Sequence, residues 1–147
     1  MTAPTDAPPW ERYPNHPMDE DSVALYEGWL VRELRLPRCR RCNRWHTPPR
    51  SLCPFCWSDD LTFTPLSGRG TVHLSMVLHV GPPAPVVEYP YPLVTVELEE
   101  QPGLRFTSTV VDGDADPVVI GSAVELVWID RAGAPFPAFR TTSGGNA

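Results

Sequence analysis

The sequence predicts a mainly β protein in which an N-terminal helix and a four-cysteine metal ribbon precede a small closed barrel of five strands. Three observations predict it. Four cysteines form two C-x-x-C pairs, a short stretch before them has helical apolar spacing, and the part after them alternates with a period of two. The expected parts are a Pro-rich tail at 1–18, a helix at 19–36, the ribbon at 37–66, the barrel at 67–142 and a flexible tail at 143–147.

The first 36 residues change character at Asp19. Five prolines before Met18 each remove a backbone donor and favour extended geometry, so a tail is expected there. From Asp19, acids and Ser22 precede apolar residues at three- and four-residue steps, which predicts a helix over about 20–34, broken by Pro37. Leu25 and Trp29 form a second apolar row, and this row either covers the protein's own ribbon or makes Trp29 a contact for a partner.

The two C-x-x-C pairs carry the clearest chemical signal. Their spacing suits a tetrahedral Zn²⁺ held by four thiolates, and it predicts as ligands Cys39, Cys42, Cys53 and Cys56. Two disulfides would need an oxidising compartment, whereas iron in a four-thiolate site stays open on ligand type alone. Four thiolates complete the tetrahedron, so His46 is not needed as a ligand and no position is left for a catalytic water. A structural metal is expected.

Charge is unevenly distributed along the 147 residues. The formal net charge is −6, yet all twelve basic residues are arginines and seven of them fall at 32–50 beside a single acid. Around the cysteines these arginines either offset the negative charge of a four-thiolate zinc and donate to its second shell, or form a phosphate-binding patch for nucleic acid or coenzyme A, with Arg38 and Arg41 as candidate contacts. The chain has no apolar run of membrane-spanning length and no leader-like start, so a cytoplasmic protein is expected.

Beyond Gly70 the chain reads as five short strands. They are expected at about 71–80, 93–99, 104–111, 123–130 and 135–141, separated by turn sequences and without an amphipathic helix between them. In the first strand Val72, Leu74, Met76, Leu78 and Val80 share one face, which predicts a half-buried strand. The oligonucleotide/oligosaccharide-binding (OB) barrel is the five-stranded candidate. The stiff connection 81–92 carries Tyr89 and Tyr91, either as a contact surface or as a loop packed on its own barrel.

Catalytic signatures are absent from the sequence. There is no nucleophile elbow, Walker loop, dinucleotide fingerprint or H-E-x-x-H pair, and the cysteines are committed to metal. His73 and His79 lie on the polar side of one expected strand without a partner base. No catalytic residue is expected, and the chain alone does not look like an enzyme.

Several segments in this order resemble a known family. They are Leu36-Pro-Arg-Cys39, Pro48-Pro-Arg50 running into Cys53-Pro-Phe-Cys56, Ser67-Gly-Arg-Gly-Thr-Val72, Val94-Thr-Val-Glu-Leu98, Val124-Glu-Leu126 and Pro137-Ala-Phe-Arg140. The family is the acyl-CoA-associated group of rubredoxin-like zinc ribbons fused to OB barrels, formerly a domain of unknown function. The resemblance covers about residues 20–141. Within this family, the chain is similar to the partner subunit of a thiolase-like steroid side-chain aldolase.

That resemblance implies a function for the chain. Members look like non-catalytic partners of thiolase-fold proteins in mixed oligomers, acting near an acyl-CoA substrate. In one branch the partner cleaves a steroid β-hydroxyacyl-CoA by a retro-aldol reaction to a 17-ketosteroid and propionyl-CoA. The resemblance implies that the four cysteines are metal ligands, and it implies no catalytic residue. Some members of the family are fused behind a hydratase domain. Partnership with another thiolase or hydratase, a lone acyl-CoA carrier, and a nucleic-acid-binding OB and ribbon protein remain as alternatives.

Overall fold

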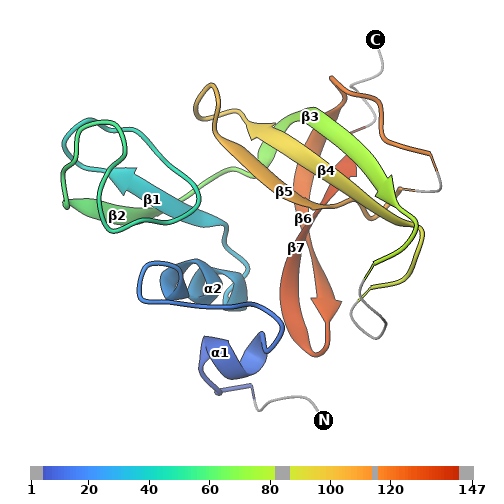
Figure 1. Cartoon of the computed structure of the whole chain (residues 1–147), viewed down its shortest axis with the longest axis horizontal. Helices are drawn as coiled ribbons and strands as arrows, with labels where there is room; N and C mark the ends of the chain where they lie inside the picture. Colours follow the sequence, from blue (N-terminus) through green and yellow to red (C-terminus); the bar gives the residue numbers. More distant parts are fainter. Residues whose placement is uncertain (1–4, 82–86, 114–115, 143–147) are drawn as a thin grey trace. The chain divides into compact units, whose positions relative to one another are not determined.

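The computed structural model describes residues 5–81, 87–113 and 116–142 (Figure 1). The chain divides into two compact units, one made of residues 1–67 with 128–137 and the other of 68–127 with 138–147. Strands β6, Ala123–Arg131, and β7, Ala134–Thr141, contribute residues to both. Among the described residues, no helix has the length and apolar character needed to cross a membrane. The expected flexible tail at 143–147 lies outside the described residues.

The first unit begins with a short helix where an extended tail was expected. Helix α1, Pro9–Arg12, starts with a proline at its first position, where a missing N–H costs nothing and the fixed φ suits a helix. Tyr13 follows and is only 4% exposed. The prediction of a purely extended tail at 1–18 was therefore wrong, because the prolines flank the helix rather than interrupt it.

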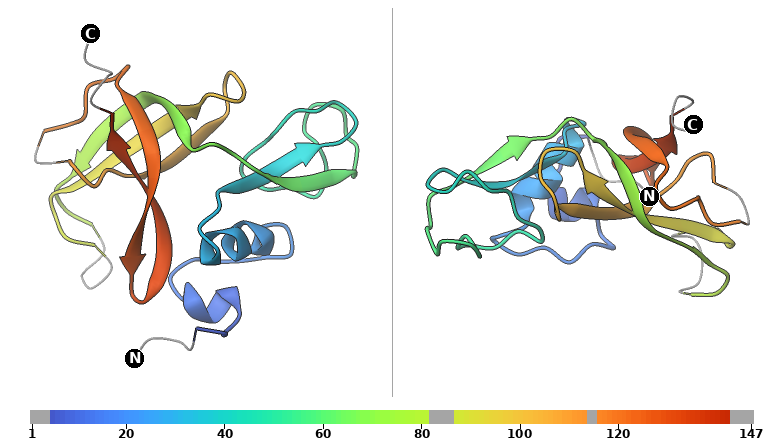
Figure 2. Two further views of the ribbon diagram at one scale, coloured as in Figure 1. Left: turned by 180° about the vertical axis from the view of Figure 1, so that it is seen from behind. Right: turned by 90° about the horizontal axis from the view of Figure 1, so that it is seen from above.

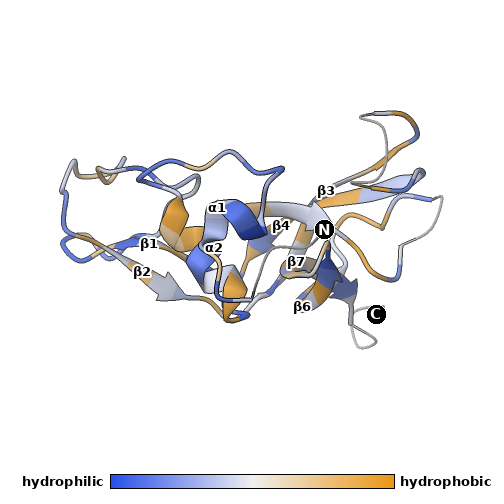
Figure 3. Ribbon diagram, turned by 90° about the horizontal axis from the view of Figure 1, so that it is seen from below, coloured by the Kyte–Doolittle hydropathy of each residue, from blue (hydrophilic) through white to orange (hydrophobic). Residues whose placement is uncertain are grey.

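Helix α2 is shorter than the predicted stretch of 20–34. It spans Val23–Leu30, with hydrophobic and hydrophilic residues interleaved (Figure 3). It ends in a left-handed residue, Arg32 at φ 58°, whose N–H donates to Trp29 O, while Glu33 N–H reaches back to Gly28 O, both at 2.9 Å. This is a Schellman ending. A Cβ at Gly28 would lie 2.8 Å from the Glu33 carbonyl oxygen, so a glycine permits the turn that stops the helix early.

A two-stranded ladder carries the cysteine loops. Strands β1, Arg35–Cys39, and β2, Leu61–Pro65, pair antiparallel, with Arg38 opposite Thr62 and Leu36 opposite Thr64. The chain between them forms the cysteine loops at the end where β1 stops and β2 starts (Figures 1 and 2). Pro37 lies within β1, buried, instead of ending a helix.

The second unit is built on a five-stranded sheet with the order β5-β4-β3-β6-β7. Strands β3, Arg69–Leu78, β4, Tyr91–Leu98, and β5, Arg105–Thr109, pair antiparallel. A parallel bridge between Val110 and Phe139 joins the two sheet edges, with Val111 N–H donating to Phe139 O at 2.8 Å. The five-stranded barrel predicted from the sequence is confirmed, and in the structure it is antiparallel and nearly closed. Its core includes Val72, Val94, Val96, Leu98, Val124 and Phe139.

The predicted single apolar face of β3 was wrong beyond Val72. The register against β4 shifts between Val72 and Leu74, so His73 is an extra residue. A bulge of one residue sends every later side chain to the opposite face. Val72 is 2% exposed, whereas Leu74 is 51% and Met76 49% exposed. The apolar row that was expected inside the barrel therefore faces outward on the second half of β3.

Candidate metal centre

The first cysteine pair lies on a tight knuckle that follows β1. Asn43 N–H donates to Cys39 O at 2.8 Å, and Cys39 N–H donates to Arg44 O at 2.9 Å. Asn43 takes the left-handed conformation at φ 65°, which asparagine tolerates better than most residues. These bonds close the loop around Cys39 and Cys42 and aim both side chains the same way.

The second pair repeats this knuckle with one notable difference. Trp57 N–H donates to Cys53 O at 2.9 Å, and Cys53 N–H donates to Ser58 O at 2.8 Å. Trp57 is the residue at the left-handed position, with φ 66°. A bulky side chain in that conformation is an outlier that costs on the order of 1 kcal/mol or more. The second knuckle thus holds the backbone of Trp57, an aromatic residue, in a strained conformation.

The two knuckles bring the four predicted ligands together. All four sulfur atoms lie within 4.8 Å of one another, with Cys39 Sγ and Cys56 Sγ 3.5 Å apart and Cys42 Sγ and Cys53 Sγ 3.6 Å apart. A tetrahedral zinc with bonds of about 2.3 Å needs sulfur separations of about 3.8 Å. The cysteines are unbridged. The four residues fit a structural zinc site, as the spacing predicted.

Backbone amides point at the sulfurs. Cys42 N–H donates to Cys39 Sγ and Phe55 N–H donates to Cys53 Sγ, each at 3.4 Å. The Cys42 amide is the main cause that lowers the pKa of the Cys39 thiol to about 6. At Cys56 the Ser58 amide is outweighed by burial and the neighbouring cysteine sulfurs, which raise the pKa of that thiol to about 11, so it is at Cys39 that the amides favour thiolate, the form that binds metal.

The arginines near the cysteines have other partners than sulfur. Arg38 Nε donates to Asn43 O at 3.0 Å, and its guanidinium lies 4.0 Å from the centre of the Trp45 ring. Arg44 lies 4.7 Å from the centre of the Phe55 ring. Within the described residues no arginine donates to a cysteine sulfur, so the expected role of these side chains as thiolate donors is not what the structure shows.

His46 lies next to the cluster without joining it. The side chain is 5% exposed, and its Nε2 accepts the Arg50 N–H at 3.3 Å. Burial is the main cause that lowers the pKa of His46. The ring therefore braces the loop between the knuckles as a neutral acceptor.

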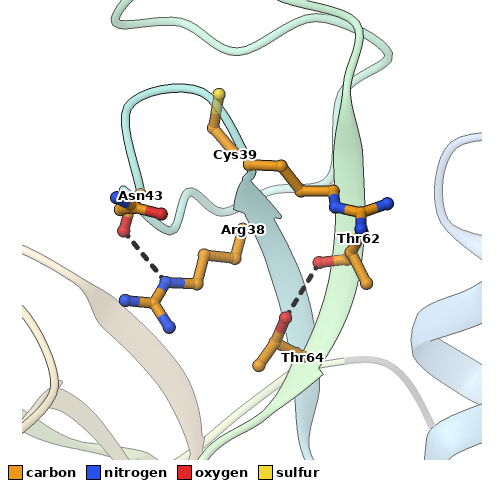
Figure 4. A pocket seen from close by; sticks show the side chains of 6 residues that line it. Arg38, Cys39, Asn43, Thr62 and Thr64 are labelled. Atoms are coloured by element: carbon orange, nitrogen blue, oxygen red, sulfur yellow. Dashed lines mark hydrogen bonds between the residues drawn. The ribbon is translucent and has the colours of Figure 1, made fainter.

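An open hollow adjoins the first knuckle. It has a volume of about 400 Å³ and is lined by Arg38, Cys39, Arg40, Asn43, Thr62 and Thr64 (Figure 4). The figure shows the Cys39 sulfur and the Arg38 guanidinium pointing in different directions, with the Arg38 Nε bonded to the Asn43 carbonyl oxygen of the knuckle loop. The hollow therefore presents guanidinium and hydroxyl groups rather than thiolate.

The other candidate contact residues differ in accessibility. Trp29 is 5% exposed and packs in an aromatic cluster with Tyr13, His16, Tyr26 and Phe136, so its burial does not fit the expected partner contact. Arg41 is exposed, and Tyr89 and Tyr91 are half-buried. Of the connection 81–92, residues 82–86 lie outside the described part.

Sequence reasoning missed the apolar tip of the second knuckle. Trp57 is 76%, Phe55 48% and Leu52 43% exposed. The available signal was a bulky aromatic directly after the second C-x-x-C pair, where the knuckle requires a positive φ. We name these three side chains the knuckle tip.

Comparison with known proteins identifies both parts of the chain. Residues 27–62 match the family model described as "ChsH2, rubredoxin-like zinc ribbon domain", and residues 63–129 match "ChsH2, C-terminal OB-fold domain". The chain is 37% identical over 92 residues to a DUF35 domain-containing scaffold protein of Methanocaldococcus jannaschii, covering 62% of this chain and 64% of that protein. A scaffold protein of the same description from Methanothermobacter thermautotrophicus is 36% identical over 99 residues, covering 62% and 68%.

Two solved structures are also similar. A chain of the Ltp2-ChsH2(DUF35) aldolase superposes with a TM-score of 0.76 at 33% identity, covering 86% of this chain and 98% of that one. A DUF35 protein of unknown function from Sulfolobus solfataricus has a TM-score of 0.59 at 11% identity, covering 88% and 92%, and it shows the fold alone. The matched region spans just under two thirds of the Methanocaldococcus relative.

Proposed function

Because this chain belongs to the DUF35 family of ChsH2-type zinc-ribbon and OB-fold proteins, we propose that it is a non-catalytic accessory subunit of a thiolase-fold acyl-CoA enzyme. The enzyme proposed is the retro-aldolase that converts a steroid β-hydroxyacyl-CoA to a 17-ketosteroid and propionyl-CoA. One observation carries this choice. The similarity to a chain of the Ltp2-ChsH2(DUF35) aldolase extends over 98% of that chain at 33% identity.

The distribution of reactive groups supports a non-catalytic role. The four cysteines are gathered at the metal site, His46 accepts a backbone N–H, and His16 lies within the aromatic cluster. Among the described residues, His73 and His79 form no hydrogen bond to a base or an orienting group, the arrangement by which a catalytic histidine is recognised. The bond-breaking chemistry would therefore belong to the partner.

The knuckle tip is the docking surface that we favour. An exposed aromatic held in a strained conformation is best explained where it has a partner to bind. The tip lies in a ribbon where residues 35–66 carry six arginines and two aspartates, so a partner with an apolar pocket and an acidic rim would complement it. Arg41, Tyr89 and Tyr91 stay as further proposed contacts, whereas buried Trp29 does not.

Reconstitution tests this function. The zinc-loaded chain, the thiolase-fold protein encoded beside it, and the mixture are each incubated with a steroid β-hydroxyacyl-CoA, and propionyl-CoA is quantified. We expect no turnover from the chain alone and a clear gain on mixing. A partner that is fully active alone, with no gain on mixing, would sink the proposal. Turnover on another acyl-CoA only would keep the accessory role and remove the steroid substrate.

Two alternatives are separated by binding measurements on the chain alone. Calorimetry with acyl-CoA tests a carrier that works without an enzyme partner. A salt-dependent shift with single-stranded DNA would favour a nucleic-acid binder, because phosphate contacts release counterions. The nine acids and three arginines from Thr71 to the end weigh against that class.

A further inference from the structure

The hollow between β1 and β2 gathers its polar groups by strand register. Arg38 stands directly opposite Thr62, and Leu36 opposite Thr64. Side chains two residues apart on a strand point to the same face. Arg38, Thr62 and Thr64 therefore lie on one side of the ladder. Together with Arg40, which follows the end of β1, they line the hollow of about 400 Å³ (Figure 4).

One guanidinium in the hollow is held in place with its terminal nitrogens open. The Nε of Arg38 is used by the Asn43 carbonyl at 3.0 Å, and the planar group stacks on Trp45 at 4.0 Å. Within the described residues, no carboxylate pairs with this arginine. An ordered fork of N–H donors loses little entropy when it binds an oxyanion.

The second guanidinium is weakly engaged. Arg40 Nη1 lies 3.9 Å from Asp60 Oδ1, with the two side chains 68% and 61% exposed. Such an exposed, long pair contributes little and exchanges readily with another anion. The Thr62 side chain is exposed at the same face, and Thr64 Oγ1 donates to Thr62 O at 3.2 Å.

The nearby thiolates do not account for this arrangement. Their sulfurs receive backbone N–H groups, and the Cys39 sulfur and the Arg38 guanidinium point in different directions (Figure 4). The Arg38 Nε donates to the Asn43 carbonyl oxygen and not to a sulfur. The donors in the hollow thus remain available for a ligand.

We propose that this hollow binds the phosphate monoester of a small ligand. A carboxylate has two oxygens, whereas a phosphate monoester offers three acceptor oxygens and close to two negative charges to two guanidiniums and a hydroxyl. Six arginines against two aspartates at 35–66 favour an anion there. The site involves the ribbon alone and does not depend on the proposed enzyme partner.

Binding to the zinc-loaded full chain tests the proposal. AMP is titrated into ¹⁵N-labelled protein at low ionic strength, with adenosine as the ligand that lacks phosphate and acetate as the carboxylate. Saturable shifts are expected at the amides of Arg40, Asn43 and Thr62 with AMP alone. Arg40→Gln should weaken AMP binding roughly tenfold, the effect of one lost charge-assisted contact. Thr62→Val keeps the β-branched shape and should weaken it less.

A charge-matched control makes the result decisive. Arg50→Gln removes the same charge from an exposed arginine of the ribbon that does not line the hollow, and AMP affinity should be unchanged. Equal losses in R40Q and R50Q would overturn the site in favour of diffuse attraction. The proposal would also be overturned if adenosine bound as tightly as AMP. It would be overturned, too, if a DNA oligonucleotide bound and R40Q and R50Q weakened that binding equally. If the chain failed to activate a thiolase-fold partner, the AMP-binding result would still stand. If AMP failed to bind, the proposed accessory function would likewise stand.

Discussion

The Tyr13 hydroxyl donates to the Pro135 carbonyl oxygen at 2.5 Å, joining two residues that are 122 positions apart in the chain. Both belong to the first unit. The Tyr13 ring also meets Trp29 edge-on, with centroids 5.5 Å apart. The N-terminal segment is thus part of the packed unit rather than an appendage to it.

Removing this hydroxyl should destabilise the first unit. Tyr13→Phe keeps the ring contacts but leaves the Pro135 carbonyl without its donor, which should lower the free energy of unfolding by about 1 kcal/mol. Tyr26→Phe is the matched control, because the Tyr26 ring belongs to the same cluster with no hydrogen bond from its hydroxyl among the described residues. Urea denaturation measures both, and equal effects would contradict the role given to the bond.

Zinc should be needed for the ribbon to fold. Removing the zinc with a chelator, or removing one of its ligands by Cys42→Ser, should unfold the two knuckles, because metal binding and folding are coupled at such sites. Elemental analysis should find about one zinc per chain in the native protein and loss of zinc in C42S. His46→Gln serves as control and should retain zinc, since His46 is not among the clustered ligands. A C42S chain that still assembled with its partner would show that the barrel, not the ribbon, organises docking.

The knuckle tip should carry much of the partner affinity. Trp57→Ala removes the most exposed aromatic of the tip and should cost roughly 2 kcal/mol of binding, about a thirtyfold rise in Kd. Trp10→Ala removes a tryptophan that is 59% exposed on α1 and should change affinity little. Binding of each soluble variant to partner protein immobilised on a surface gives the two dissociation constants. Unchanged affinity in W57A with full zinc content would exclude the tip as the docking surface.

Stability should fall on acidification partly through His16. Burial, and then the Arg131 guanidinium, lower the pKa of His16 below 6.5. The unfolded chain therefore binds this proton first, so the stabilisation is complete above pH 6.5 and is lost as the pH falls toward the folded value. His16→Phe keeps an aromatic ring among Tyr13, Tyr26 and Trp29 and should flatten the pH dependence of the urea midpoint between about pH 5 and 8.

A control isolates this effect from the other histidines and from zinc loss. His79→Gln changes an exposed histidine and should leave the dependence as in the native protein. His46, whose pKa burial also lowers, and the four cysteines are present in all three proteins. A native slope in H16F would assign the acid sensitivity to those groups.

Local spacing was enough to predict the metal centre. Each pair of ligands is three residues apart, and the hydrogen bonds that shape each knuckle join residues within five positions, so chain connectivity sets the geometry. The five barrel strands were likewise predicted, since each is a short stretch bounded by turn residues. These features depend on neighbours along the chain.

Tertiary packing decided what periodicity could not. The bulge at His73, which turns Leu74 and Met76 outward, arises from the register between β3 and β4 and leaves no mark in the alternation itself. The burial of Trp29 depends on Tyr13 and Phe136, which arrive from opposite ends of the sequence. The sequence by itself determined the ligands and the order of the elements, because those follow from local chemistry. Which apolar side chains face solvent was decided by contacts between distant segments, and only the folded chain contains them.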